Sequence, residues 1–134
     1  MTMLLMTVDA ERKEMCWATA GHEPPILYDP ASDHFSEFNG SGMSLGLVKG
    51  VAYEEHLFTD VQPGQVIMAL TDGLWEAFNR DGEMFGKDRV CNLVRRYANL
   101  SAAEISERII AELARFLGTK SPDDDLTFVI VKVL

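Results

Sequence analysis

Long apolar segments are missing from this 134-residue sequence. Runs such as Val66–Leu70 and Phe128–Val131 fall far below the roughly 18 residues that a membrane-spanning helix needs. The first ten residues, Met1–Ala10, contain no basic segment of the kind that begins a signal peptide. The sequence therefore predicts neither a membrane span nor a secretion signal.

Basic side chains and cysteines are also scarce. The chain has 12 Lys and Arg against 21 Asp and Glu, which gives a net charge of −9. Binding to nucleic acid or to an anionic membrane depends on clustered basic residues, so we expect neither as a partner. The two cysteines, Cys16 and Cys91, form no CxxC pair, and a reduced, cytoplasmic setting is the simplest interpretation.

The residues that are present suffice for one domain with a buried core. Hydrophobic residues make up 47% of the chain, and domains mostly have about 100–150 residues. The part up to about Thr71 has the short apolar runs and turn residues of strands, including the alternating segment Ala52–Phe58. Its last run, Val66–Thr71, predicts a strand buried on both faces in the middle of a sheet.

The second half of the chain is predominantly helical. Its pattern predicts a short helix at Leu74–Phe78 and a longer one at Lys87–Ala98. Ser101 and Glu104 form a capping-box pattern that opens a further helix. The residues that we expect this helix to bury are Ile105, Ile109, Leu113 and Phe116. A β-branched strand, Leu126–Leu134, ends the chain, so strands packed under a pair of helices give an α+β, layered architecture.

Asp72, in Thr71-Asp72-Gly73, is the first residue that could carry chemistry. It follows the predicted central strand, where a carboxylate is well placed to face a cleft, and the adjacent glycine lets other groups approach closely. The alternative role for Asp72 is a turn residue that caps the following short helix, and on the pattern alone this is the better interpretation.

The run Asp123-Asp124-Asp125 is the second candidate. Adjacent carboxylates repel one another unless a cation or solvent relieves the repulsion, and all-oxygen clusters suit Mg²⁺, Mn²⁺ or Ca²⁺. Alone, the run is better explained as a solvated acidic loop between a helix and a strand.

His22 is the third candidate, because it lies between a glycine and two prolines. A histidine in this position could be a ligand or an acid, but more often it anchors a turn by hydrogen bonds, which we favour here. His34 and His56 have no partner pattern, and the sequence contains no P-loop, GxSxG or zinc spacing.

Six short motifs, taken together and in order, resemble one family over essentially the whole chain. The motifs are Ala20-Gly21-His22 with Pro24-Pro25, Ser44-Leu45-Gly46-Leu47, Pro63-Gly64-Gln65, Thr71-Asp72-Gly73-Leu74-Trp75-Glu76-Ala77, Asn79 with Gly82-Glu83 and Phe85-Gly86, and Asp124-Asp125-Leu126-Thr127. The sequence in this respect resembles the metal-dependent protein phosphatase (PPM) family, in its bacterial SpoIIE/RsbU-type branch.

The resemblance implies a layered α-β-β-α sandwich of two antiparallel sheets, with Mn²⁺ or Mg²⁺ bound at one end. The metals would activate a water that hydrolyses phosphoserine or phosphothreonine. Asp72 and Asp124 match the family's catalytic carboxylates that bind metal, and Asp125 has a supporting role by the same comparison. The implied substrate is a phosphorylated regulatory protein of anti-anti-sigma type, and the implied parent chain carries an upstream sensor or receiver domain and acts in sigma-factor regulation.

The sequence departs from the family in one respect: the family's upstream Asp-Gly motif, whose aspartate bridges both metals, has no match here. Residues 1–134 therefore resemble the C-terminal portion of a single PPM-type catalytic domain, and we expect weak Mn²⁺ binding and poor activity. A non-catalytic phosphatase-like module for protein binding or dimerisation is the alternative. Sheet edges that further strands would cover are expected to pair with another copy or to distort.

Overall fold

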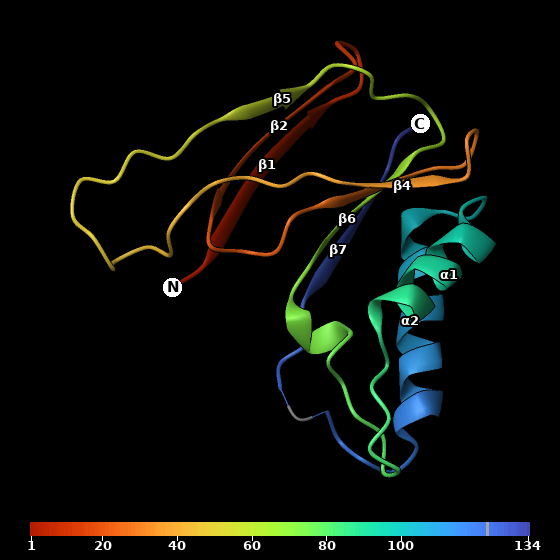
Figure 1. Ribbon diagram of the computed structural model, residues 1–134. Helices are drawn as coiled ribbons and strands as arrows, with labels where there is room; N and C mark the ends of the chain where they lie inside the picture. The colour runs from red at the N-terminus through yellow and green to blue at the C-terminus, as the bar shows by residue number, and fades with distance from the viewer. Residues whose placement is uncertain (123) are drawn as a thin grey trace.

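The computed structural model describes residues 1–122 and 124–134 and consists of two antiparallel sheets and two α-helices (Figure 1). The first sheet has the strand order β1-β2-β5. Its strands are β1 (Met3–Asp9), β2 (Glu14–Ala20) and β5 (His56–Phe58). β1 and β2 pair along their whole length, from Met3 opposite Ala20 to Asp9 opposite Glu14, so they form a hairpin.

The second sheet has the order β4-β3-β6-β7. Its strands are β3 (Ile26–Asp29), β4 (His34–Glu37), β6 (Val66–Leu70) and β7 (Phe128–Lys132). β6 pairs with β3 on one side and with β7 on the other. Four of its five residues are buried, which confirms the prediction of a central strand covered on both faces.

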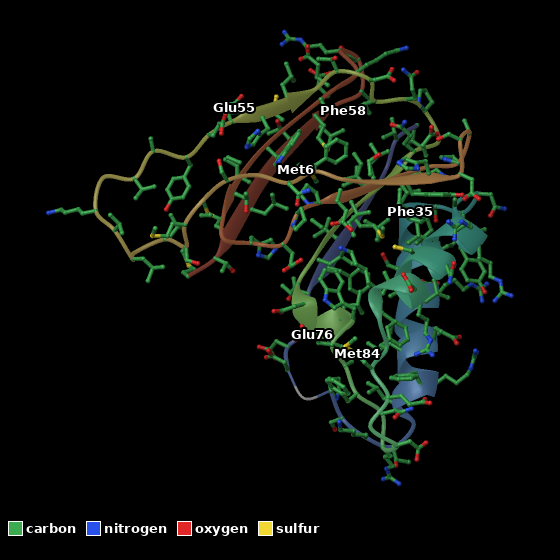
Figure 2. The ribbon with its side chains drawn as sticks, viewed as in Figure 1. Met6, Phe35, Glu55, Phe58, Glu76 and Met84 are labelled. Atoms are coloured by element: carbon green, nitrogen blue, oxygen red, sulfur yellow. The ribbon has the colours of Figure 1, made fainter. Side chains whose placement is uncertain are left out.

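The side chains of β6 divide between two hydrophobic clusters. Val66, Met68 and Leu70 point to the helical layer, whereas Ile67 points to the first sheet, as alternation along a strand requires. Partly buried residues complete the layer between the sheets, where Figure 2 shows Met6 and Phe58. The molecule is therefore a sandwich with its second sheet at the centre.

Both long helices, α1 (Lys87–Tyr97) and α2 (Ala102–Leu117), cover the β4-β3-β6-β7 sheet (Figure 1). Within the described residues no helix covers the outer face of the other sheet, where Leu5 and Leu57 are exposed. The α+β class and the two antiparallel sheets are confirmed, and one of the two expected helical layers is seen. No helix among the described residues is long and apolar enough to cross a membrane.

Several predicted boundaries were wrong. The alternating segment Ala52–Phe58 contributes only His56–Phe58 to a strand, because β5 has a pairing partner only opposite Met15–Trp17. In place of a helix at Leu74–Phe78 the chain forms a single 3₁₀ turn at Asp72–Leu74. The final strand is Phe128–Lys132 rather than Leu126–Leu134, since residues 124–127 lie against the end of β6.

The capping box of α2 is confirmed. The Ser101 hydroxyl accepts from the Glu104 amide at 3.3 Å, and the Glu104 carboxylate accepts from the Ser101 amide at 3.0 Å. The buried face contains Ile105, Ile109 and Leu113 as predicted, but its fourth buried member is Leu117. Phe116 lies at the margin, where its ring meets Phe85 edge-on at 5.3 Å between centroids.

A polar cluster ties α1 to the β3–β4 turn. Arg95 donates from Nε to Asp33 Oδ1 at 2.6 Å, Tyr28 donates from its hydroxyl to the same oxygen at 3.0 Å, and the Arg95 guanidinium lies 5.1 Å from the Phe35 ring centre. The hydrogen bonds from Arg95 and then Tyr28 hold the pKa of the Asp33 carboxyl below its usual value. The ionised carboxylate is therefore the form that the fold stabilises.

The Asp33 cluster predicts a defined pH dependence of stability. The native pKa is lowered, so ionised Asp33 contributes stability above the unfolded value of about 3.9 and loses it as the pH falls through the native value. We expect Asp33→Asn to lower the urea midpoint at neutral pH and to have a shrinking effect at acid pH. Asparagine tolerates the left-handed φ of 50° at this position, so the substitution tests the charge rather than the backbone. A destabilisation that stayed constant down to the lowest pH would contradict this account.

Two adjacent isoleucines on α2 provide a matched test of the core. Ile109 is 0% exposed and Ile110 is 56% exposed. We expect Ile109→Ala to lower the free energy of unfolding by about 2–5 kcal/mol, because it leaves a cavity under the helix. Ile110→Ala removes the same atoms from a solvent-exposed position, and it should change the free energy of unfolding by less than about 0.5 kcal/mol. If both substitutions lowered the free energy of unfolding equally, the assignment of the buried and exposed faces of α2 would be wrong.

Candidate metal-binding end of the sandwich

Asp72 lies at the point where β6 leaves the sheet. Its backbone carbonyl accepts from the amides of Trp75 and Glu76, which forms the 3₁₀ turn, and Leu74 is fully buried beneath it. The Asp72 side chain is exposed, and its Oδ1 accepts from the Gly73 amide at 2.9 Å. The carboxylate is thus held at the surface by the turn that follows it.

The loop that carries Asp124 is attached to the same place. The Thr71 amide donates to the Thr127 carbonyl at 2.9 Å, the Thr71 hydroxyl donates to that carbonyl at 3.2 Å, and the Thr127 amide donates back to the hydroxyl at 3.3 Å. These three hydrogen bonds extend the pairing of β6 with β7, whose last register pair is Leu70 opposite Phe128. We call this set of contacts the Thr71–Thr127 junction.

Gly73 brings the two loops together just beyond the junction. A Cβ atom at this position would lie 2.7 Å from the Asp125 carbonyl oxygen, which is closer than side-chain carbons approach such atoms. Only glycine therefore fits, and the segments containing Asp72 and Asp124 lie side by side at one end of the sandwich.

The two aspartates nevertheless line different hollows. Asp124 accepts from the Asp125 amide at 2.7 Å and borders an open depression of about 450 Å³ formed with Pro122, Asp125 and Leu126. Asp123, the remaining member of the acidic run, lies outside the described residues. Asp124 and Asp125 therefore lie next to the junction and are exposed to solvent.

Asp72 borders a smaller hollow of about 100 Å³, whose other lining residues are Thr2, Gly21, His22, Glu23 and Thr71. His22 is fixed there by the buried Thr19, whose hydroxyl donates to the His22 carbonyl at 3.0 Å and accepts from the His22 amide at 3.2 Å. The Thr2 hydroxyl lies 3.4 Å from His22 Nδ1. The turn is fixed through the backbone of His22, so these bonds do not test the anchoring role predicted for its imidazole; His22 also lies in the wall of the Asp72 hollow. No spacing in the sequence indicated this second feature.

The residues at this end fit a hard divalent cation in chemistry but not in number. Carboxylate oxygens are the ligands that Mn²⁺ and Mg²⁺ prefer. Among residues 1–122 and 124–134, however, no three His, Cys, Asp or Glu side chains gather as a metal-binding group. The described residues thus offer carboxylates from two neighbouring loops and would need at least one further ligand to complete a metal site.

Comparison with known proteins adds family information. The family described as Stage II sporulation protein E (SpoIIE) matches residues 1–134. Phosphoserine phosphatase RsbU of Bacillus subtilis is 25% identical over 134 residues, which span 98% of this chain and 38% of that protein. Protein IcfG of Synechocystis is 26% identical over 97% of this chain and 20% of its own length. The chain therefore spans well under half the length of these relatives.

Solved structures agree with the fold. The SiaA-PP2C domain of Pseudomonas aeruginosa superposes with a TM-score of 0.79 at 25% identity, covering 96% of this chain and 50% of that domain. The SpoIIE phosphatase domain of Bacillus subtilis, presoaked with Mn, gives a TM-score of 0.65 at 17% identity, covering 98% of this chain and 56% of that structure. The present chain thus spans about half the length of each of these two structures.

The junction itself can be tested by removing one hydroxyl. Thr71→Val keeps the shape of the side chain and removes both hydrogen bonds of its oxygen, so we expect a loss of about 1–2 kcal/mol in stability and faster hydrogen exchange at the Thr127 amide. Thr7→Val, on the exposed face of β1, serves as the matched control and should leave that amide unchanged. Unaltered exchange at Thr127 in the Thr71 variant would show that the junction does not hold the acidic loop.

Proposed function

This chain belongs to the SpoIIE family, and we propose that it forms part of the catalytic domain of a metal-dependent protein serine/threonine phosphatase, with Asp72 and Asp124 as metal ligands. The observation that carries the proposal is the Thr71–Thr127 junction, since it holds the loops of both aspartates at one end of the sandwich. The relative RsbU is a phosphoserine phosphatase, which supports the choice of reaction.

We assign these residues separate roles in the proposed site. Asp72 and Asp124 would hold Mn²⁺ or Mg²⁺, Asp125 would support them, and Thr71 and Gly73 position the two loops. When bound, such metals lower the pKa of a coordinated water and neutralise charge on the phosphoryl oxygens. Asp72 Oδ1 accepts from the Gly73 amide, so the side chain is already oriented before any cation arrives.

For the substrate, we infer a phosphorylated regulatory protein, of anti-anti-sigma type, in the cytoplasm. The parent protein would join this domain to an upstream sensor or receiver domain, in keeping with the small share of RsbU and IcfG that the chain spans. The net charge of −9 also suits a protein partner better than nucleic acid or an anionic membrane.

By this proposal, residues 1–134 are the C-terminal portion of the catalytic domain and are poorly active alone. Two facts support this: the chain covers 50% of the SiaA domain, and no group of three metal ligands is found in the described part of the chain. The second fact also favours the alternative, a non-catalytic module that binds a protein partner. Metal binding distinguishes the two functions.

Titration with Mn²⁺ by calorimetry is the direct test of the metal ligands. We expect weak binding to this chain that is reduced at least about tenfold in Asp72→Asn and in Asp124→Asn, since even residues behind metal ligands typically contribute 10–100-fold. Asp81→Asn, an exposed aspartate in the turn after Asn79, is the matched control and should bind as the unchanged chain does.

Two results would count against the proposal. Equal Mn²⁺ affinity in Asp72→Asn, Asp124→Asn and Asp81→Asn would exclude the first two as ligands. Robust turnover of a phosphoserine peptide by this chain, lost in Asp72→Asn, would retain the phosphatase function but refute the incompleteness of the site.

A further inference from the structure

A cleft of about 830 Å³ lies against α1 and shares no lining residue with the hollows of Asp72 and Asp124. Its walls come from the turn before α1, from α1 itself and from one residue of α2. Pockets that bind ligands have roughly 300–1,000 Å³. The cleft, which we call the α1 cleft, is therefore large enough for a ligand, and the proposed phosphatase chemistry does not use it.

The walls of the α1 cleft have the composition of a hydrated surface. Five of its ten lining residues are charged, namely Lys87, Asp88, Arg89, Arg96 and Glu112. Surfaces that pack permanently inside a fold are depleted in charged side chains, so further elements of the same domain are poorly suited to this cleft. The exposed apolar Leu5 and Leu57, on the outer face of the first sheet, suit such packing better. The α1 cleft therefore fits a separate, charged partner.

Two arginines of the cleft have no carboxylate partner. Lys87 forms an ion pair with the last residue of β4 at 2.7 Å, and Glu112 forms one with Arg115. No ion pair within the described part of the chain includes Arg89 or Arg96, although the chain has 21 acidic side chains for 12 basic ones. Both guanidinium groups can therefore accept an external anion without breaking an internal ion pair.

Arg89 is held in place by aromatic rings. Its guanidinium lies 4.5 Å from the Phe116 ring centre and 5.3 Å from that of Phe85, and its Nη1 donates to the Phe85 carbonyl at 3.1 Å. An arginine side chain has five N–H donors in a planar fork, and this is the one hydrogen bond that Arg89 forms with the described residues. The remaining donors are oriented in advance, so little side-chain freedom is lost when a carboxylate binds them.

Arg96 repeats the charge of Arg89 two turns further along α1. Seven residues separate them, so they lie on the same side of the helix, about 10.5 Å apart along its axis. The buried Leu93 lines the cleft between them, and Met84, labelled in Figure 2, adds an apolar wall that is 49% exposed. The α1 cleft thus combines two spaced cations with an apolar strip.

Charge complementarity selects an acidic helix as the occupant. Two carboxylates at positions i and i+7 of a helix have the same axial separation as the two guanidinium groups, and apolar residues on the same side would meet Leu93 and Met84. The net charge of −9 repels an acidic partner, but physiological salt screens this repulsion beyond about 8 Å. Direct contacts between arginine and carboxylate are charge-assisted and frequently bidentate, so they persist at short range.

We propose that the α1 cleft is a docking groove for an acidic amphipathic helix of a partner protein, which places one carboxylate on Arg89 and another on Arg96. Amphipathic helices bind grooves in this way, with their apolar side inward. The proposal goes beyond the phosphatase chemistry and does not depend on it, because no residue of the cleft belongs to the candidate metal site.

Binding of a designed peptide tests the groove. The probe is a fluorescein-labelled amphipathic helix of more than about 15 residues, since shorter isolated helices are marginal in water, with glutamates at i and i+7 and leucines on the same side. We expect the full chain to bind it in an anisotropy titration. Arg89→Gln/Arg96→Gln should raise Kd at least about tenfold, because hydrogen bonds between charged groups contribute that much or more.

Two further variants make this test specific. Arg12→Gln/Lys49→Gln removes the same two charges from exposed positions outside the cleft and should leave Kd unchanged. Arg96→Gln alone should also weaken binding, and because Arg96 is exposed, this substitution leaves the core intact. Melting temperatures of all variants show whether a loss of binding reflects a loss of folding.

Four outcomes overturn the proposal. In the first, the unchanged chain does not bind the peptide, and in the second the Arg89/Arg96 variant binds it as tightly as the Arg12/Lys49 variant does. In the third, a peptide of the same composition with its glutamates on the opposite side binds equally well. In the fourth, phosphatidylcholine–phosphatidylglycerol vesicles bind the chain through Arg89 and Arg96, which would make the cleft a membrane contact.

Discussion

The antiparallel pairing of β6 with β7 is the constraint on which the rest of this structure depends. The register runs from Val66 opposite Lys132 to Leu70 opposite Phe128, so the end of one strand and the start of the other lie at the same edge. Residues far apart in the sequence therefore meet at the Thr71–Thr127 junction. The register is itself fixed by packing, because a slip of one residue would exchange the β6 side chains that face the helical layer with those that face the first sheet.

Elements of the fold that depend on local chemistry were predictable from the sequence. The α2 helix begins where Ser101 and Glu104 cap each other, and β6 is a continuous apolar strand in the interior of its sheet. Elements that depend on a distant partner were not: β5 is short because only part of β2 is available to pair with it. Phe116 was expected inside the core, but the course of α2 over the sheet gives that place to Leu117.

The candidate site was likewise predictable from the sequence only in part. Residue type and motif order were enough to select Asp72 and Asp124, and the chain itself joins the loops that contain them. The sequence could not show that these side chains border separate hollows, nor that His22 belongs to the hollow of Asp72. Those facts follow from where the β1–β2 hairpin ends relative to β6, which is a property of the packing of two sheets and not of any motif.

Two glycine-containing loops of this chain are under opposite steric constraints. At Gly73 even one methyl group would collide with the Asp125 carbonyl, so the acidic loops can take only one arrangement. At Gly46 and Gly50 the surroundings are open, and the side chains between them touch no part of the core. Substitutions of Leu47 or Val48 therefore leave the packing of the core unchanged, whereas a substitution at Gly73 displaces the junction and the acidic loop together.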